Sequence, residues 1–369
     1  MLELDRFLCL LPQPWPQQAA AGRAHIERAL RDPVSAAVIR TKPALFPGLC
    51  DVPRYFYPEA SEEALLLGLE LNIWFFYFDD PFDDGDISLT DRTAGAALID
   101  RMVKLLDSGE LPPEPSPLEL LCLQFRERAR RLCPGRPNTL RRFVESCIHW
   151  TDSVLPAAST QHGATLPVLA SYDEARGTNI GILPLAYINE IDGPLEFDDA
   201  FFADPVIRRM HALTCLIICH CNDLYSYEKE MRLSARPFNS LFLRQHHDGL
   251  DLDAAFEQHL AGLAGWLAEL AELEASLLTR DGRADSAKRG PTWRMDQAHA
   301  QYIQRLKRLI LGNHLWSIHG GRYSSPTSPF VELRTPAPQS STATWSLTDA
   351  PGPRTKDTHR VGPAGDADL

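Results

Sequence analysis

The fold class follows most directly from residues 203–231, which read ADPVIRRMHALTCLIICHCNDLYSYEKEM. Apolar residues recur there at the three- and four-residue spacing of an α-helix, and an aspartate and a proline stand at the start, as at many helix N-termini. The run LTCLIICHC within this stretch, residues 213–221, is strongly apolar. We therefore expect a long helix that is largely buried.

The same spacing recurs along most of the chain. Proline and glycine cluster between the helical stretches, and alternating strand patterns are rare. The other long stretches are residues 62–78, 116–132, 139–155, 251–278 and 292–319. The pattern predicts a single all-α domain, a helical bundle with room for a central cavity between its long helices.

The last part of the chain differs in composition from the rest. Beyond about Ser324, proline, serine, threonine and glycine dominate, and the apolar periodicity disappears. Such a composition is typical of disorder. We predict a helical domain over residues 1–323 and a disordered tail over residues 324–369.

The bulk composition restricts the function. Hydrophobic residues make up 44% of the 369 residues, which is enough for a globular core. The net charge of −12 argues against nucleic-acid binding. The N-terminus lacks signal-peptide features, no apolar run reaches membrane-spanning length, and none of the eight cysteines forms a C-x-x-C pair. We expect a reduced, cytoplasmic protein without a membrane span.

An acidic cluster follows the apolar, aromatic helix predicted at residues 62–78. The segment FYFDDPFDDGD, residues 76–86, includes Asp79, Asp80 and Asp83, and Pro81 should end the helix near this point. Carboxylates repel one another and are unfavourable at a helix C-terminus, so a positive charge must compensate. Clustered carboxylate oxygens suit Mg²⁺. The alternative interpretation is a solvated acidic turn.

A second polar set lies near the end of the helix predicted at residues 203–231. Asn222, Ser226 and Glu230 recur every four residues, which aligns them on one helix face. Amide, hydroxyl and carboxylate oxygens again match Mg²⁺, and the neighbouring Lys229 offers a positive charge to a phosphate. The alternative is an ordinary helix whose C-terminal half reaches the surface.

Together these motifs resemble those of bacterial class I terpene synthases. The first family motif, D-D-x-x-D, matches the acidic cluster, and the second, N-D-x-x-S-x-x-K-E, matches residues 222–230 without a gap. Bacterial members also carry an Arg-Tyr pair after the last helix and an arginine that senses diphosphate in a helix-breaking segment. These features correspond here to Arg322, Tyr323 and Arg176. One departure is that the linker and effector positions after the sensor are Asn179 and Ile180, followed by Gly181.

The resemblance covers about residues 50–323 and implies a fold, an activity and a ligand set. It implies a class I terpenoid synthase-like bundle that ionises a linear isoprenyl diphosphate and cyclises the carbocation. Farnesyl diphosphate, the commoner case, is expected ahead of geranylgeranyl diphosphate, and a homodimer is common in the family. Three Mg²⁺ ions would be bound by Asp79, Asp80, Asp83, Asn222, Ser226 and Glu230. The diphosphate would be bound by Arg176, Lys229, Arg322 and Tyr323.

Three aromatic residues are candidates for the wall that faces the carbocation. Phe75 and Phe76 lie one turn before the acidic cluster, and Trp316 resembles a pocket aromatic of bacterial members. Aromatic faces can stabilise positive charge and exclude water. They are equally common as ordinary core residues, and this alternative stays open.

Other readings of the sequence make different predictions. An isoprenyl chain-elongating synthase uses two Asp-rich motifs, of which we find one, and a protonation-initiated cyclase needs D-x-D-D, which is absent. A non-enzymatic helical protein that binds divalent cations or a lipid-like ligand is a further alternative. A zinc site in the segment Cys215–Cys221 is disfavoured, because its cysteines lie on different helix sides and no second ligand pair has zinc-site spacing.

Overall fold

A computed structural model describes residues 1–16, 20–83, 92–234, 236–280 and 293–334. Within these ranges the regular elements are helices, and a single isolated parallel bridge joins Leu2 to Phe330. The predicted all-α fold is therefore confirmed.

The described residues form the following helices in chain order. The 3₁₀ helices are η1 (Leu4–Leu10) and η2 (Phe46–Gly48). The α-helices are α1 (Ala24–Arg31), α2 (Pro33–Thr41), α3 (Val52–Phe56), α4 (Glu62–Asp83), α5 (Arg92–Ser108), α6 (Pro117–Leu132), α7 (Pro137–Gln161), α8 (Leu169–Asn179), α9 (Ile182–Ile191), α10 (Asp199–Ala203), α11 (Pro205–Leu233), α12 (Ser240–Asp248), α13 (Leu252–Arg280) and α14 (Gln297–His319).

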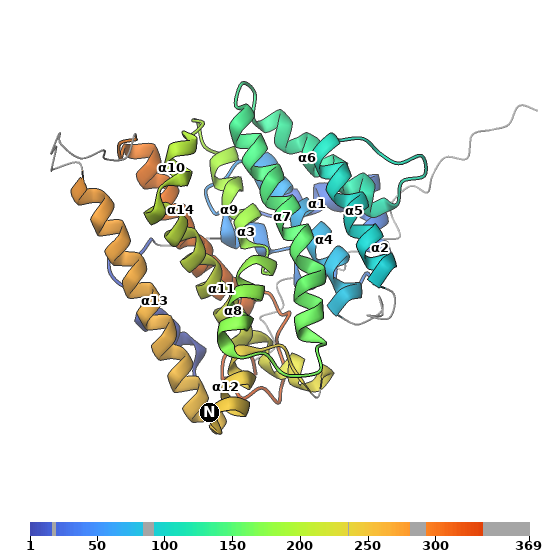
Figure 1. Cartoon of the computed structure of the whole chain (residues 1–369). Helices are drawn as coiled ribbons and strands as arrows, with labels where there is room; N and C mark the ends of the chain where they lie inside the picture. The colour runs from blue at the N-terminus through green and yellow to red at the C-terminus, as the bar shows by residue number, and fades with distance from the viewer. Residues whose placement is uncertain (17–19, 84–91, 235, 281–292, 335–369) are drawn as a thin grey trace, which may run out of the picture.

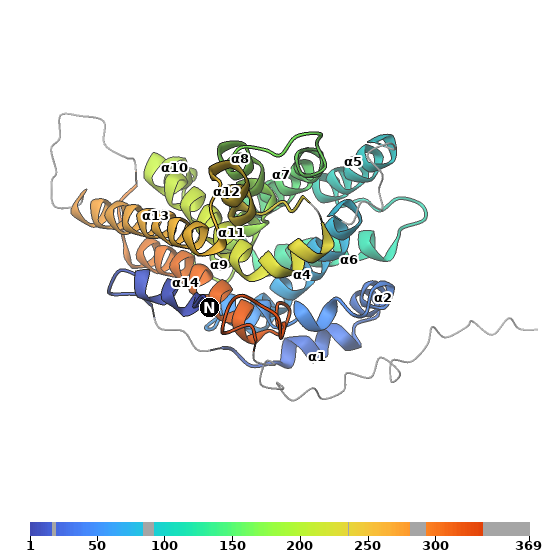
Figure 2. The ribbon, with the colours of Figure 1, turned by 90° about the horizontal axis from the view of Figure 1, so that it is seen from below.

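Helix α11 is central to the bundle, as its apolar sequence predicts. It packs against α14, α13, α8, α12 and α9. Figures 1 and 2 show α13 along one side of the molecule and α2, α5 and α6 at the opposite side. The side chain of Asp204 caps the N-terminus by accepting a hydrogen bond from the Val206 N–H at 2.8 Å, and Pro205 occupies the first helical position. The cap and the buried face together explain where this helix starts and why it lies inside.

Helix α4 runs further than its proline predicts. It continues through Pro81 to Asp83, whereas we expected it to end near Pro81. Because Pro81 stands in the last turn, its missing N–H removes one hydrogen bond and leaves the turns before it intact. Most of the helix is buried, and Trp74 and Phe78 stack in the core at 5.4 Å between ring centroids.

Part of the predicted tail belongs to the folded body. Phe330 and Leu333 are fully buried, and Phe330 packs against Phe256 of α13. The Leu4 N–H donates to a Glu332 carboxylate oxygen at 2.9 Å, so this segment also holds the N-terminus. The ordered body therefore extends beyond residue 323 to Arg334, and residues 335–369 lie outside the described ranges.

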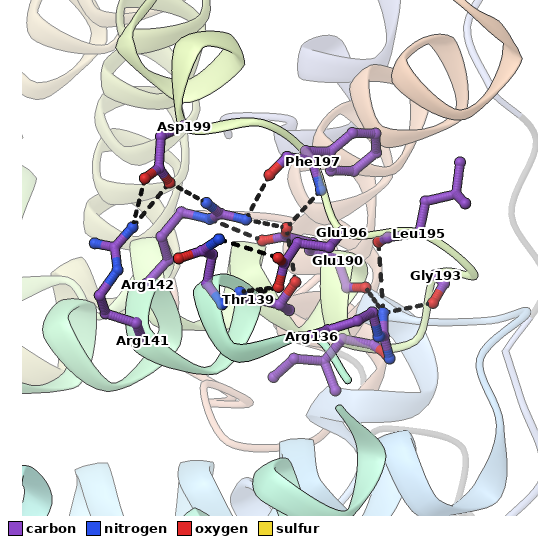
Figure 3. A network of polar contacts seen from close by, with 12 residues as sticks. Arg136, Thr139, Arg141, Arg142, Glu190, Gly193, Leu195, Glu196, Phe197 and Asp199 are labelled. Carbon is purple, nitrogen blue, oxygen red and sulfur yellow. Dashed lines mark hydrogen bonds and ion pairs between the residues drawn. The ribbon is translucent and has the colours of Figure 1, made fainter. Parts of the chain in front are cut away.

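A buried ion pair fixes the far end of α9. Arg142 of α7 donates to the Glu190 carboxylate at 2.5 Å and to the Phe197 carbonyl at 2.9 Å, and both charged side chains are almost completely buried. Thr139 donates to the same carboxylate at 3.0 Å (Figure 3). Because a buried carboxylate needs such partners, the network holds α9 firmly against α7.

Two further features concern the state of the cysteines and the hydrophobicity of the helices. All eight cysteines are free thiols, and all except Cys9 are buried. Among the described residues, no helix is both long enough and apolar enough to cross a membrane.

Candidate active site

One cavity brings the predicted site residues together. It has a volume of about 730 Å³ and is lined by residues of α3, α4, α7, α8, α9, α11 and α14, together with the segment after α14. Every predicted site residue except Asp83 lines it: Phe75, Phe76, Asp79, Asp80, Arg176, Asn222, Ser226, Lys229, Glu230, Trp316, Arg322 and Tyr323. The side chain of Asp83 and all of residues 84–91 lie outside the described part of the structure.

Helix α4 supplies the acidic wall. Asp79 and Asp80 come from its last described turns, and Asp80 forms an ion pair with Lys42, just after α2. The Tyr77 hydroxyl donates to the Lys42 carbonyl at 2.8 Å and so fixes the end of α2 beside α4. We did not predict the role of Lys42, because a lone lysine distant in sequence gives no signal of its partner.

Helix α11 supplies the facing wall. The Asn222 amide nitrogen donates to the Tyr323 hydroxyl at 2.8 Å, and the Ser226 hydroxyl donates to the Asn222 carbonyl at 2.9 Å. Glu230 accepts a hydrogen bond from the Asn239 amide at 2.9 Å. Exclusion of solvent by the surrounding protein raises the pKa of Glu230 to about 7, and the nearby Asp223 carboxylate adds to the effect.

The remaining acid of the second motif has a structural role. Asp223 is fully buried and accepts hydrogen bonds from the Tyr172 hydroxyl at 2.7 Å and the Ser240 N–H at 3.1 Å. It therefore joins α11 to α8 and α12. Asn239 contacts both Glu230 and Asp223, since its side-chain amide also donates to the backbone carbonyl of Asp223 at 2.8 Å. Sequence reasoning missed Asn239, although an asparagine before an apolar stretch is a typical helix cap.

A helix break carries the predicted diphosphate sensor. Helix α8 ends at Asn179 and α9 begins at Ile182, with Gly181 between them at φ +74°. Arg176 donates to the Asn179 side-chain oxygen at 3.1 Å, and the Trp150 indole N–H donates to the Asn179 carbonyl at 2.8 Å. These contacts show how the departure at residues 179–181 is accommodated.

Gly181 is required at the break for two reasons. Its backbone is left-handed, a conformation that costs other residues free energy. A methyl carbon added to it would also lie 3.3 Å from a Phe75 ring carbon and 3.4 Å from Trp150 Nε1. The break between α8 and α9 therefore packs directly against the rings of Phe75 and Trp150.

Aromatic rings surround the rest of the cavity. Phe75 and Trp150 lie 4.2 Å apart between ring centroids, and Trp316 meets Tyr323 edge-on at 5.8 Å. The Arg322 guanidinium lies over the Phe76 ring at 4.6 Å. The cavity thus combines a charged end with an aromatic interior.

The donor set fits a hard divalent cation. Carboxylate oxygens from α4 line one cavity with amide, hydroxyl and carboxylate oxygens from α11, the hard oxygen donors that such a cation prefers. Among the described residues, no three His, Cys, Asp or Glu side chains group as a metal site. In the segment disfavoured for zinc, Cys219 is buried and the His220 ring binds Asp173 at 2.8 Å.

Solved structures share this fold. Linalool/nerolidol synthase from Streptomyces clavuligerus superposes with a TM-score of 0.65 at 21% identity, covering 83% of this chain and 99% of the other. Germacradien-4-ol synthase from Streptomyces citricolor has a TM-score of 0.66 at 18% identity, covering 83% of this chain and 97% of the other. At these identities the similarity shows the fold alone.

Sequence relatives extend the comparison to the family. Terpene synthase 1 of Acytostelium subglobosum is 32% identical over 281 residues, which cover 76% of this chain and 82% of that protein. Terpene synthase 6 of Dictyostelium discoideum is 31% identical over 285 residues, which cover 76% of each. The family described as terpene synthase family 2, C-terminal metal binding, matches residues 70–261, which include both motifs. The chain therefore belongs to the terpene synthase family and is an enzyme of that family.

Proposed function

We propose that the protein is a Mg²⁺-dependent class I terpene cyclase that converts a linear isoprenyl diphosphate to a cyclic terpene with release of diphosphate. Farnesyl diphosphate is the favoured substrate, and geranylgeranyl diphosphate is the second choice. The observation that carries the proposal is the single cavity in which α4 and α11 present oxygen donors to each other above an aromatic interior.

The two polar walls divide the work of holding the leaving group. Asp79, Asp80 and Asp83 on α4, and Asn222, Ser226 and Glu230 on α11, would hold Mg²⁺, three ions by the family resemblance. When bound there, Mg²⁺ supplies positive charge that stabilises the departing diphosphate.

Basic and phenolic side chains would bind the remaining phosphate oxygens. Arg176 and Lys229 line the cavity with Arg322 and Tyr323. The Tyr323 hydroxyl oxygen accepts a hydrogen bond from Asn222, so its own proton is available to a phosphate oxygen. The planar guanidinium groups match phosphate geometry. Departure of the diphosphate leaves an allylic cation in the cavity.

The aromatic interior would protect that cation. Phe75 and Trp316 are buried in the cavity wall, and Phe76 lies beneath Arg322 at the border between the charged and aromatic parts. Their ring faces attract positive charge and offer no nucleophile. We propose that they shape the folding of the isoprenyl chain as well as packing the core.

The experiment is incubation of the purified chain with C10, C15 and C20 isoprenyl diphosphates and Mg²⁺. Gas chromatography would identify terpene products, and a coupled assay would measure diphosphate release. We expect a cyclic product and stoichiometric diphosphate from the C15 substrate, and none with a chelator. Longer diphosphates formed only on addition of isopentenyl diphosphate would instead support chain elongation. Absence of turnover with all three substrates would refute the proposal.

A further inference from the structure

Two buried amides line the cavity, each at an earlier position on its helix than the site residues predicted from the sequence. Asn72 of α4 and Asn313 of α14 both line the cavity, and each is only 3% exposed. At 1.5 Å per residue, Asn72 lies about 10 Å along α4 from Asp79, and Asn313 lies a similar distance before the end of α14. Along its own helix, each amide is thus separated by about two turns from the polar residues or the helix end nearer the predicted diphosphate site.

The hydrogen bonds of the two amides are incomplete. The Asn72 amide nitrogen donates to the Gly68 carbonyl at 2.7 Å, which leaves its carbonyl oxygen available to the cavity. The Asn313 amide nitrogen is buried, and no acceptor for it exists among the described residues. Apolar side chains of Phe56, Ile182 and Leu185 also line the cavity. A buried amide donor in such surroundings is normally satisfied by a water molecule.

The polarity of the unpartnered Asn313 amide N–H indicates what kind of group it can bind. An N–H donor presents the positive end of its dipole, so it cannot serve to stabilise a carbocation. Asn179 has a similarly unpartnered amide nitrogen, but it lies beside Arg176 at the diphosphate end, where phosphate oxygens can accept. Because apolar side chains line the same cavity, a small neutral oxygen suits the Asn313 donor. Water fits, because it accepts from Asn313 and can donate to Asn72.

We propose that Asn313, with Asn72, holds a water molecule that captures the carbocation, so that the product is a terpene alcohol. The inference rests on the proposed cyclase function. The water oxygen forms a C–O bond to the cationic carbon with one of its lone pairs. The resulting oxonium loses one proton, relayed through water in the cavity, to the released diphosphate anion, the strongest base that the reaction generates. The products are then an alcohol and protonated diphosphate.

The test is the product of the full-length enzyme with farnesyl diphosphate and Mg²⁺ in oxygen-18-labelled water. Mass spectrometry of the wild-type product should show a hydroxyl group that carries the label. Asn313→Leu should lower the ratio of alcohol to hydrocarbon at least about tenfold, equivalent to about 1.4 kcal/mol in relative barriers, while diphosphate release persists. If this variant does not fold, the labelling of the wild-type product still tests the capture of the carbocation by water, and an unlabelled product refutes it.

A matched control is available in α9. Asn189 is buried and also has an unpartnered amide nitrogen among the described residues, but it does not line the cavity. Asn189→Leu should therefore keep the wild-type product ratio. An unlabelled product, a wild-type product that is only hydrocarbon, or an unchanged ratio in Asn313→Leu would each overturn the inference. Failure of the cyclase function itself would appear differently, as absence of diphosphate release from the wild-type enzyme.

Discussion

Replacement of Gly181 by alanine tests whether the helix break positions the cavity wall. The left-handed backbone at Gly181 costs an alanine about 1–2 kcal/mol, so the free energy of unfolding should fall by at least that amount. The added methyl carbon also lies 3.3 Å from the Phe75 ring, so the ring or the break must shift by a few tenths of an ångström. Because α8 carries Arg176 into the break, we expect kcat to fall about tenfold.

Gly135 provides the matched control for this substitution. It has nearly the same φ, +73°, but an added methyl carbon would meet nothing within 4 Å. Gly135→Ala should therefore lose a similar stability from the backbone alone and keep its activity. Chemical denaturation would measure the stability of both variants, and diphosphate release would measure kcat. Equal kcat in Gly181→Ala and Gly135→Ala would refute the claim that the contact with Phe75 matters.

Three further predictions concern other parts of the site and the core. Phe76→Ala should change the distribution of terpene products more than it lowers the melting temperature, because Phe76 borders the cavity while remaining partly exposed; gas chromatography and thermal melting would compare the two effects, and the opposite order would make Phe76 a packing residue. Asn239→Ala removes the cap of α12 and the hydrogen bond to Glu230, so it should cost about 1 kcal/mol of stability and raise the Mg²⁺ concentration needed for half-maximal activity; an unchanged Mg²⁺ requirement would contradict this. The pKa of His25 is lowered by burial to about 4, below its ordinary value of 6.5, so the unfolded chain binds more protons between these pH values and stability falls as pH drops from 6.5 toward 4. His25→Leu should reduce this slope by about 1.4 kcal/mol per pH unit in denaturation experiments near pH 5, and an unchanged slope would contradict the assignment.

The convergence of the two motifs could be predicted from the sequence. The acidic cluster and residues 222–230 each have a spacing that places oxygen donors on one helix face, and the buried sequence before Asn222 places its helix inside the bundle. The family resemblance then predicted that Arg176 and Tyr323 would meet them. The structure lines one cavity with all of these residues that it describes, which is the arrangement that the spacing and the resemblance together implied.

Other features depend on packing that a local pattern does not encode. The ion pair between Lys42 and Asp80 forms because α2 lies beside the end of α4, and neither residue shows this in sequence. Phe330 and Leu333 stand among prolines and serines without helical periodicity, so composition placed them in the tail. Phe330 pairs with Leu2 and packs against Phe256 of α13, and only the folded chain brings these distant residues together.

An experimental structure with Mg²⁺ and inorganic diphosphate would test the central claim most directly. We predict that Asp79 on one wall and Asn222 and Glu230 on the other would hold the metal ions, and that Arg176 and Arg322 would contact the diphosphate. A diphosphate bound outside this cavity, or one held by the residues of a single wall, would contradict the account.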